Sequence, residues 1–223
     1  MRRDLRCLIS RARTGRNNRA VLFNRDKIIL DLCGGTGAWS KPYKDAGYDV
    51  RVIDLPENNV INFIPPENTY GILAAPPCTM FSLAAGKKME DRDTITGMQT
   101  VNACIRIIFT TNPVFWALEN PVGYLRRFLG LPRLTFKQWE YGDNGIKPTD
   151  IWGEFKLPYK PIYDHHNPKI ATKPSKKDLV YISAGGSSGR DPRKALGKVA
   201  KRDAIIARVT PPGFARAFFE ANP

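Results

Sequence analysis

The sequence predicts an α/β fold in which helices cover both faces of a mostly parallel sheet. Strand and helix signals alternate along residues 27–121, as they do in consecutive βαβ units. A glycine-rich or polar cluster directly follows each strong strand signal, which is where open α/β sheets form their binding crevice. The 223 residues are enough for one well-buried domain with a small appended region.

The first βαβ unit spans residues 27–54. An apolar strand at 27–32 runs into the turn Cys33–Gly37, and a helix is expected from there to Ala46, with Gly47 ending it. A second strand covers 49–54. A glycine-rich turn at the carboxyl end of a first strand lets a ligand approach the backbone closely.

Two further strands end in unusual turns. The strand at 71–75 leads into Pro76-Pro77-Cys78, and the strand at 114–118 ends in Glu119-Asn120-Pro121. Between them, residues 94–109 are expected to form an amphipathic helix that Pro113 stops. A last helix is predicted at 212–221, apolar on the face that carries Phe214, Ala217, Phe218 and Ala221.

The charge of the chain indicates a polyanionic partner. There are 35 Lys and Arg against 21 Asp and Glu, a net charge of +14, and the pI is about 9.8. Such an excess favours nucleic acid, because each neutralised phosphate releases condensed counterions, over a basic protein with no such partner. The arginine-rich start, residues 2–19, is followed by no apolar segment, which disfavours a secretory signal and favours a basic arm or a disordered tail over a transit peptide.

Several classes are disfavoured by composition. Four cysteines without CxxC spacing and two histidines argue against a disulfide framework or a zinc cluster, so no metal is expected and a reducing, cytoplasmic compartment fits. No apolar run approaches the roughly 18–20 residues that span a bilayer, so no membrane partner is expected.

The glycine turn and the acidic residue after it indicate a nucleoside cofactor. The turn reads GGTG and not GxGxxG, so a dinucleotide pyrophosphate is disfavoured. Asp54 ends the next strand about 20 residues on, where a carboxylate can accept both ribose hydroxyls. S-adenosylmethionine (SAM) suits a site without a phosphate requirement. The alternative is a tight turn beside a solvated aspartate.

Cys78 is either a small packing residue or a nucleophile held rigidly by two prolines. Glu119 at the end of the neighbouring predicted strand favours a nucleophilic role for Cys78. The alternative for Glu119 itself is an acidic residue at the start of a helix. A thiolate beside a carboxyl group suits attack on an electron-poor ring whose nitrogen the carboxyl group hydrogen-bonds.

With these residues in place, the chain resembles the cytosine-C5 DNA methyltransferase family. Asp31–Ser40 is similar to the SAM-binding first motif, and Pro77-Cys78-Thr-Met-Phe81-Ser82 resembles the catalytic Pro-Cys-x-x-Phe-Ser motif. Glu119-Asn120 matches the Glu-Asn of the next catalytic motif, with Pro121 in place of the usual Val. The resemblance covers residues 27–125 and implies a Rossmann-like SAM-dependent methyltransferase fold.

The resemblance also implies roles. Cys78 would add to C6 of a flipped-out cytosine, Glu119 would bond N3 and the exocyclic amine, Asn120 would support the loop, and C5 would take the methyl group. Asp54 would hold the cofactor ribose, and Asn59-Val60 would contact the adenine. The predicted cofactor-binding set is Asp31, Cys33, Gly34, Gly35, Thr36, Gly37, Trp39, Asp54, Leu55, Asn59, Val60 and Pro76.

Besides Pro121, the chain departs from the family at three places. Asn59 stands where Asp is common, and its side-chain carbonyl remains an acceptor for an adenine amine. The Gln-Arg-rich motif is reduced to Gln138–Gly142, so Lys147 or Thr149 is expected to take over the contact to cytosine O2. Thr210–Ala215 replaces the Gly-Asn-Ser-Val motif and is expected to complete the cofactor pocket.

The expected organisation has four parts: a basic arm (1–25), a SAM-binding catalytic core (26–130), a small target-recognition region that contacts DNA (131–200) and a C-terminal helix that returns to the core (201–223). The short recognition region is typical of a compact phage-like enzyme, acting as a monomer in a bacterial or phage-infected cell.

Other functions stay open. An enzyme that methylates adenine N6 or cytosine N4 needs an aromatic residue after its Pro-Pro turn, where Cys78 stands. An RNA cytosine-C5 enzyme carries its nucleophile in the later turn, which here is Glu-Asn-Pro. Transfer of a modified alkyl group from a SAM analogue, and a non-catalytic nucleic-acid-binding protein that keeps the fold, are the remaining alternatives.

Overall fold

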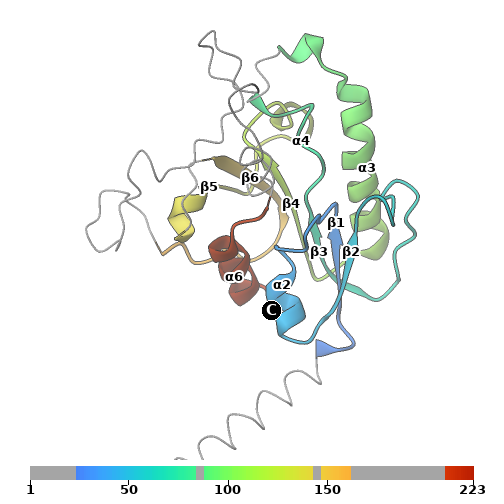
Figure 1. Cartoon of the computed structure of the whole chain (residues 1–223), viewed down its shortest axis with the longest axis vertical. Coiled ribbons are helices and arrows are strands. Elements are labelled where there is room, and N and C mark those ends of the chain that lie inside the picture. The colour runs from blue at the N-terminus through green and yellow to red at the C-terminus, as the bar shows by residue number, and fades with distance from the viewer. Residues whose placement is uncertain (1–23, 84–87, 143–146, 162–208) are drawn as a thin grey trace, which may run out of the picture.

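A six-stranded sheet forms the centre of the molecule (Figure 1), with strand order β2-β1-β3-β4-β6-β5. The computed structural model describes residues 24–83, 88–142, 147–161 and 209–223. The strands are β1 Ile28–Leu32, β2 Asp49–Ile53, β3 Thr69–Ala74, β4 Phe115–Pro121, β5 Leu134–Lys137 and β6 Pro148–Glu154. The helices are α2 Lys41–Asp45, α3 Thr94–Thr111, α4 Arg126–Leu129 and α6 Pro212–Ala221, with 3-10 turns η2 Met89–Asp91 and η3 Gln138–Tyr141.

The sheet is parallel on one side and antiparallel on the other. β2, β1, β3 and β4 run parallel, whereas β6 pairs antiparallel with both β4 and β5. The predicted α/β class and its four parallel strands are confirmed. The antiparallel pair was not foreseen.

The sheet reaches further along the chain than expected. Residues 134–154 fall inside the interval predicted as a target-recognition region, yet β5 and β6 complete the sheet. The reason is burial: Ile151 of β6 is fully buried on one face of the sheet and Trp152 is nearly so on the other, which requires a strand with both faces covered. Residues 162–200 of that interval lie outside the described residues.

Two hydrophobic layers cover the two faces, as the sequence predicted. Alternate strand residues such as Leu30 and Ile29 point to opposite faces. The long helix α3 covers one face through Val101, Cys104 and Ile107 and their neighbours. The helices α2 and α6 cover the other face (Figure 1), where the layer is strongly aromatic: Trp39, Tyr43, Phe115, Phe136, Phe214 and Phe218.

Local signals explain most element ends. Asp93 caps α3, its side chain accepting from the Thr96 amide, and Asn112 in the left-handed region ends that helix before Pro113. Gly47, with a φ of 88°, follows α2 as predicted. β4, however, continues through Pro121 instead of stopping at Leu118, because Glu119 and Asn120 pair with β6.

The chain order creates a crevice between β1 and β3. From β1 the chain moves outward to β2, and it then crosses back over β1 to enter β3. Such a reversal of direction leaves a gap at the carboxyl ends of the two central strands, which is where ligands bind in open α/β sheets. Within the ranges given above, no helix is both long and apolar enough to cross a membrane.

Candidate functional site

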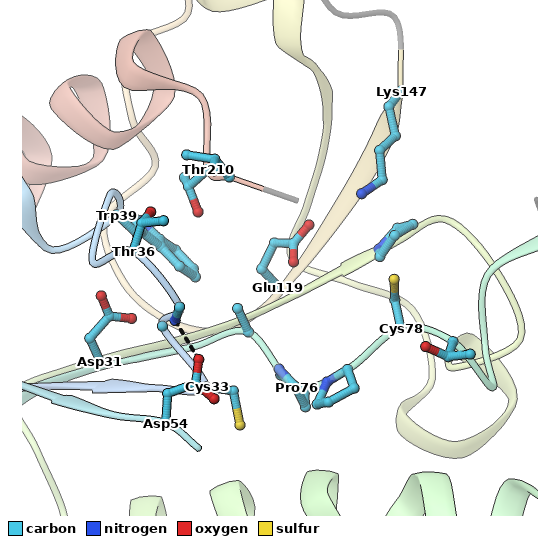
Figure 2. A pocket seen from close by; sticks show the side chains of 17 residues that line it. Asp31, Cys33, Thr36, Trp39, Asp54, Pro76, Cys78, Glu119, Lys147 and Thr210 are labelled. Atoms are coloured by element: carbon cyan, nitrogen blue, oxygen red, sulfur yellow. Dashed lines mark hydrogen bonds between the residues drawn. The ribbon is translucent and has the colours of Figure 1, made fainter. Parts of the chain in front are cut away.

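A pocket of about 420 Å³ opens at the carboxyl ends of β1, β2, β3 and β4 (Figure 2). Its wall combines residues of the glycine turn, the Pro-Pro-Cys turn, the end of β4 and the segment before α6. The lining residues are Asp31, Cys33, Gly34, Gly35, Thr36, Trp39, Asp54, Ala75, Pro76, Pro77, Cys78, Thr79, Glu119, Pro121, Lys147, Val209 and Thr210.

One end of the pocket is built by the glycine turn after β1. Cys33, Gly35 and Gly37 all have positive φ, and the Gly37 amide donates to the Gly34 carbonyl at 2.9 Å. A Cβ added at Gly34 would lie 2.4 Å from the Asp31 carboxyl group. Only glycine fits at position 34, so the backbone of the turn lies directly over a buried acid.

Asp31 is fully buried beneath this turn. Its Oδ2 accepts a hydrogen bond from the Ser40 hydroxyl at 2.5 Å, whereas its Oδ1 has no hydrogen-bond partner. Burial raises the pKa of Asp31 to about 6, although the bonds from Ser40 oppose the rise. An ionised carboxylate in this position requires a cationic or hydrogen-bonding partner, which a ligand in the pocket can supply.

Asp54 follows β2 and faces the same turn. Its Oδ2 accepts from the Gly35 amide at 2.8 Å (dashed in Figure 2), and its Oδ1 accepts from the Leu55 amide at 2.9 Å. Each carboxylate oxygen has a second lone pair, so Asp54 can still accept two hydroxyl protons from a ligand. The two hydrogen bonds from backbone amides fix the orientation of the Asp54 carboxylate.

The other end of the pocket carries Cys78. The Asn120 side-chain amide donates to the Pro76 carbonyl at 3.0 Å, which ties the Pro-Pro-Cys turn to β4. On the other side of the cysteine, the amides of Phe81 and Ser82 both donate to the Cys78 carbonyl, at 3.0 and 2.8 Å. The turn is therefore anchored before and after Cys78.

Three functional groups meet at this end. Figure 2 shows the Cys78 sulfur, the Glu119 carboxyl group and the Lys147 amine pointing into one space between the strand ends. They come from the turn after β3, from β4 and from the residue before β6. The Cys33 sulfur instead points away from this space and hydrogen-bonds with Cys104 of α3.

The surroundings at this end of the pocket make the Glu119 carboxyl group a weaker acid. Burial raises the pKa of Glu119, Lys147 opposes that rise, and the negative charge of Asp150 adds to it. Asp150 itself is completely buried on β6. Arg126 bonds both of its oxygens at 2.7 Å, and the Thr135 hydroxyl bonds Oδ1 at 2.6 Å.

Most of the predicted site residues line the pocket, and five do not. Asn120 lies behind the turn and Gly37 lies outside the lining. Leu55 is 67% exposed, Asn59 is exposed with its Oδ1 bonded to the Ile61 amide, and Val60 is buried in the core beside α3.

Sequence reasoning missed two supporting networks. One is the Arg126–Asp150–Thr135 cluster beneath Glu119, and the other is Arg92, whose guanidinium bonds the carbonyls that follow Cys78. Neither arginine belongs to a local pattern, so no sequence signal distinguished it. Among the residues with described positions, no three His, Cys, Asp or Glu side chains gather as a metal site would require.

Comparison with known proteins finds partial structural likeness. No family model matches the chain, and no curated protein matches it. A crystal structure assigned as a DNA modification methyltransferase, encoded within an E. coli prophage, is similar in part of its fold, with 18% sequence identity and a TM-score of 0.43. The likeness covers 57% of this chain and 46% of that one, so the chain spans about half of that protein's length.

Proposed function

We propose that this protein is a SAM-dependent DNA (cytosine-5)-methyltransferase in which Cys78 is the covalent nucleophile. The observation that carries the proposal is the meeting of Cys78, Glu119 and Lys147 at one end of a pocket whose other end is a glycine turn. A thiol, a carboxyl group and an amine in one space are the groups that addition to a cytosine ring requires.

The chemistry of the glycine-turn end fits SAM. The unpartnered Oδ1 of Asp31 suits the ammonium of the amino-acid part, and the free lone pairs of Asp54 suit two ribose hydroxyls. The missing Cβ at Gly34 lets the turn lie against the Asp31 carboxyl group, and a pocket of about 420 Å³ is of the size that small cofactors occupy. When bound, SAM supplies an electrophilic methyl group on a sulfonium sulfur.

The reaction starts with attack by Cys78. Its thiolate forms a bond to C6 of the cytosine, and the C5–C6 electron pair moves toward C5. Glu119 in its protonated form hydrogen-bonds N3, which stabilises the charge that develops on the ring. C5 then takes the methyl group, so that the methyl–sulfur bond of SAM breaks and S-adenosylhomocysteine is left. Solvent accepts the C5 proton, and the electrons of that C–H bond restore the double bond as the Cys78 thiolate leaves.

Lys147 and Asn120 support this chemistry in different ways. The Lys147 amine, which points into the reaction end, is proposed to donate to cytosine O2, a role the missing Gln-Arg-rich motif would have filled. Asn120 does not touch the base in this account. It holds the Pro76 carbonyl and thereby the direction from which Cys78 attacks.

DNA is proposed as the substrate on the basis of charge. The described residues hold 16 Lys and Arg against 15 Asp and Glu, a net charge of +1, so +13 of the total +14 falls in 1–23, 84–87, 143–146 and 162–208. We propose that the basic arm and the 162–208 segment grip phosphates, which offsets the few kcal/mol needed to flip a base out of the stack. Residues 1–23 of the arm and all of the 162–208 segment lie outside the described residues.

Nucleoside mass spectrometry tests the proposal. The full chain is incubated with SAM and DNA, the DNA is digested, and the modified nucleosides are identified. The expected product is 5-methylcytosine, which the Cys78→Ala variant does not form. Modified adenine, N4-methylcytosine, a larger transferred group, or equal transfer by wild type and variant would each overturn it.

A further inference from the structure

We propose that Arg92 is a positioning residue that fixes the Cys78 turn for attack. The inference rests on the proposed function, because it assigns a role relative to the nucleophile named there. Arg92 does not line the pocket and is not a catalytic residue. It acts through the backbone that carries Cys78.

Three hydrogen bonds from Arg92 converge on one turn. Its Nη1 donates to the carbonyls of Ser82 at 2.9 Å, Met80 at 3.2 Å and Thr79 at 3.4 Å. These carbonyls belong to the residues that directly follow Cys78. Arg92 is itself only 9% exposed, so its charge has been taken out of water to make these bonds.

A second segment meets the same turn from the end of β4. The Tyr124 amide donates to the Phe81 carbonyl at 2.8 Å, and Ser82 forms a bridge with Gly123. A Cβ at Gly123 would lie 2.3 Å from the Phe81 carbonyl oxygen, so this approach requires glycine. The Arg92 guanidinium also lies over the Tyr124 ring, 5.0 Å from its centroid, and so joins the two segments.

An arginine is suited to this task for a physical reason. A guanidinium is more weakly hydrated than an ammonium, so it can be buried at lower cost, and the two N–H groups of Nη1 are shared among the three carbonyls. Buried carbonyl oxygens that lose such a donor are left without a hydrogen bond. The turn would then relax, and the Cys78 sulfur would move relative to the ring it attacks.

Cys78 is thus held from both sides by side chains from elsewhere in the fold. Asn120 holds the Pro76 carbonyl before it, and Arg92 holds the three carbonyls after it. A misplacement of about 1 Å can cost roughly 10²-fold in rate. The loss of Arg92 should therefore lower the rate of the chemical step more than it lowers binding.

The chain offers a matched control in Arg106 of α3. Its Nη2 donates to the carbonyls of Phe63 at 3.0 Å, Ile61 at 3.3 Å and Val60 at 3.5 Å, the same kind of contact. None of these four residues lines the pocket. Arg106→Ala therefore reports the effect of losing an arginine whose role is structural alone.

The experiment compares Arg92→Ala, Arg92→Lys and Arg106→Ala with wild type. For each, single-turnover methyl transfer, binding of S-adenosylhomocysteine (SAH) and DNA, and the unfolding temperature are measured. We expect Arg92→Ala to lower the transfer rate by about 10²-fold with binding unchanged, and Arg92→Lys to recover part of it. Arg106→Ala should lower the unfolding temperature comparably and keep the wild-type rate.

Equal rate losses for Arg92→Ala and Arg106→Ala would overturn the inference, as would a loss confined to SAH or DNA affinity. If Arg92→Ala does not fold, Arg92→Lys decides, because a wild-type rate in that variant contradicts the need for a guanidinium at this position.

A second readout separates this inference from the proposed function. Alkylation of Cys78 by iodoacetamide, followed by peptide mass mapping, needs neither DNA nor methyl transfer. Its rate should change severalfold in Arg92→Ala and not in Arg106→Ala. A wild-type protein that transfers no methyl group refutes the proposed function, whereas an alkylation rate that Arg92→Ala leaves unchanged refutes the positioning role.

Discussion

The two ends of the pocket are built in different ways. The glycine-turn end comes from one continuous stretch, residues 31–54, and its side chains are already engaged: Asp31 with Ser40, and Asp54 with two backbone amides. The Cys78 end collects residues 78, 119 and 147 from three separate strand ends, and their functional groups point into one space.

The difference indicates a division of labour. Groups that are bonded and directed before a ligand arrives suit recognition of a cofactor in its ground state. Groups that converge on one space, with a carboxyl group whose pKa is raised, suit stabilisation of charge that develops only during reaction. Variants at the first end should therefore change affinity, and variants at the second should change turnover.

The largest effect is expected from Glu119→Gln. Glutamine keeps a hydrogen-bond donor near N3 but loses the titratable proton, so turnover should fall by roughly 10²–10⁴-fold. SAH affinity, measured by calorimetry, should stay unchanged. A loss of SAH affinity as large as the loss in turnover would show that the two ends of the pocket do not have separate roles in binding and reaction.

Lys147→Met should lower turnover by about 10²-fold, as loss of one preorganised donor to a polarised oxygen does. Because Lys147 opposes the raised pKa of Glu119, its removal should also move the loss of activity at high pH to a higher pH. The rate falls as pH rises through the pKa of Glu119, since the protonated form is the donor. The pH profile of single-turnover transfer measures both effects, with Lys147→Arg as the control that keeps the charge. Unchanged turnover would remove Lys147 from the reaction.

Asp54→Asn should weaken SAH binding by about 10–100-fold, since hydrogen bonds to a charged acceptor contribute about 1.5–3 kcal/mol. Turnover at saturating SAM should remain that of wild type. The matched control is Asp49→Asn, which changes a half-buried aspartate at the start of β2 whose carboxylate accepts hydrogen bonds from Arg51 at 2.7 and 3.1 Å. Equal affinities in the two variants would exclude Asp54 from the cofactor site.

SAH affinity should depend on pH through Asp31. Its pKa is about 6 in the ligand-free pocket, and only the ionised form attracts an ammonium. Affinity should therefore fall about tenfold per pH unit below pH 6, where binding must first remove a proton. Calorimetry across pH 5–7 measures this, and Asp31→Asn should abolish the slope. A slope that survives in the variant would point to another group.

The smallest effect concerns the stability of the ligand-free protein. The folded-state pKa of Asp31 is raised from 3.8 to about 6, so the folded state binds the proton more tightly than the unfolded state. The resulting stabilisation is present at low pH and is lost as pH rises through 6. The free energy of unfolding in urea should be about 1 kcal/mol larger at pH 5 than at pH 7, and this difference should shrink in Asp31→Asn.

The contrast between the two ends of the pocket also explains how much of the site the sequence could predict. The glycine-turn end is local, so the βαβ pattern of residues 27–54 and the turn at Gly34 could be found from strand signals and glycine spacing. Cys78 and Glu119 could be paired because each follows or ends a strand signal. Three cofactor-binding residues were predicted from the family resemblance alone: Leu55, Asn59 and Val60. None of them lines the pocket.

The antiparallel part of the sheet escaped prediction for a physical reason. β6 begins with Pro148 and carries Thr149 and Asp150, which read as turn residues, yet both are buried inside the sheet. The cost of burying Asp150 is offset by Arg126 and Thr135, which lie 24 and 15 residues away in sequence. No local pattern contains that compensation. The role of Arg92 was hidden in the same way, because its partners are backbone carbonyls.

The central claim is that Cys78 forms a covalent bond to cytosine. DNA that carries 5-fluorocytosine tests it most directly, because fluorine at C5 cannot leave as the proton does, and the bond between enzyme and DNA persists. With SAM present, a denaturation-resistant adduct should form and peptide mass spectrometry should locate it at Cys78, with none in Cys78→Ala. An adduct at Cys33 or Cys104, or an equal yield in Cys78→Ala, would contradict the account.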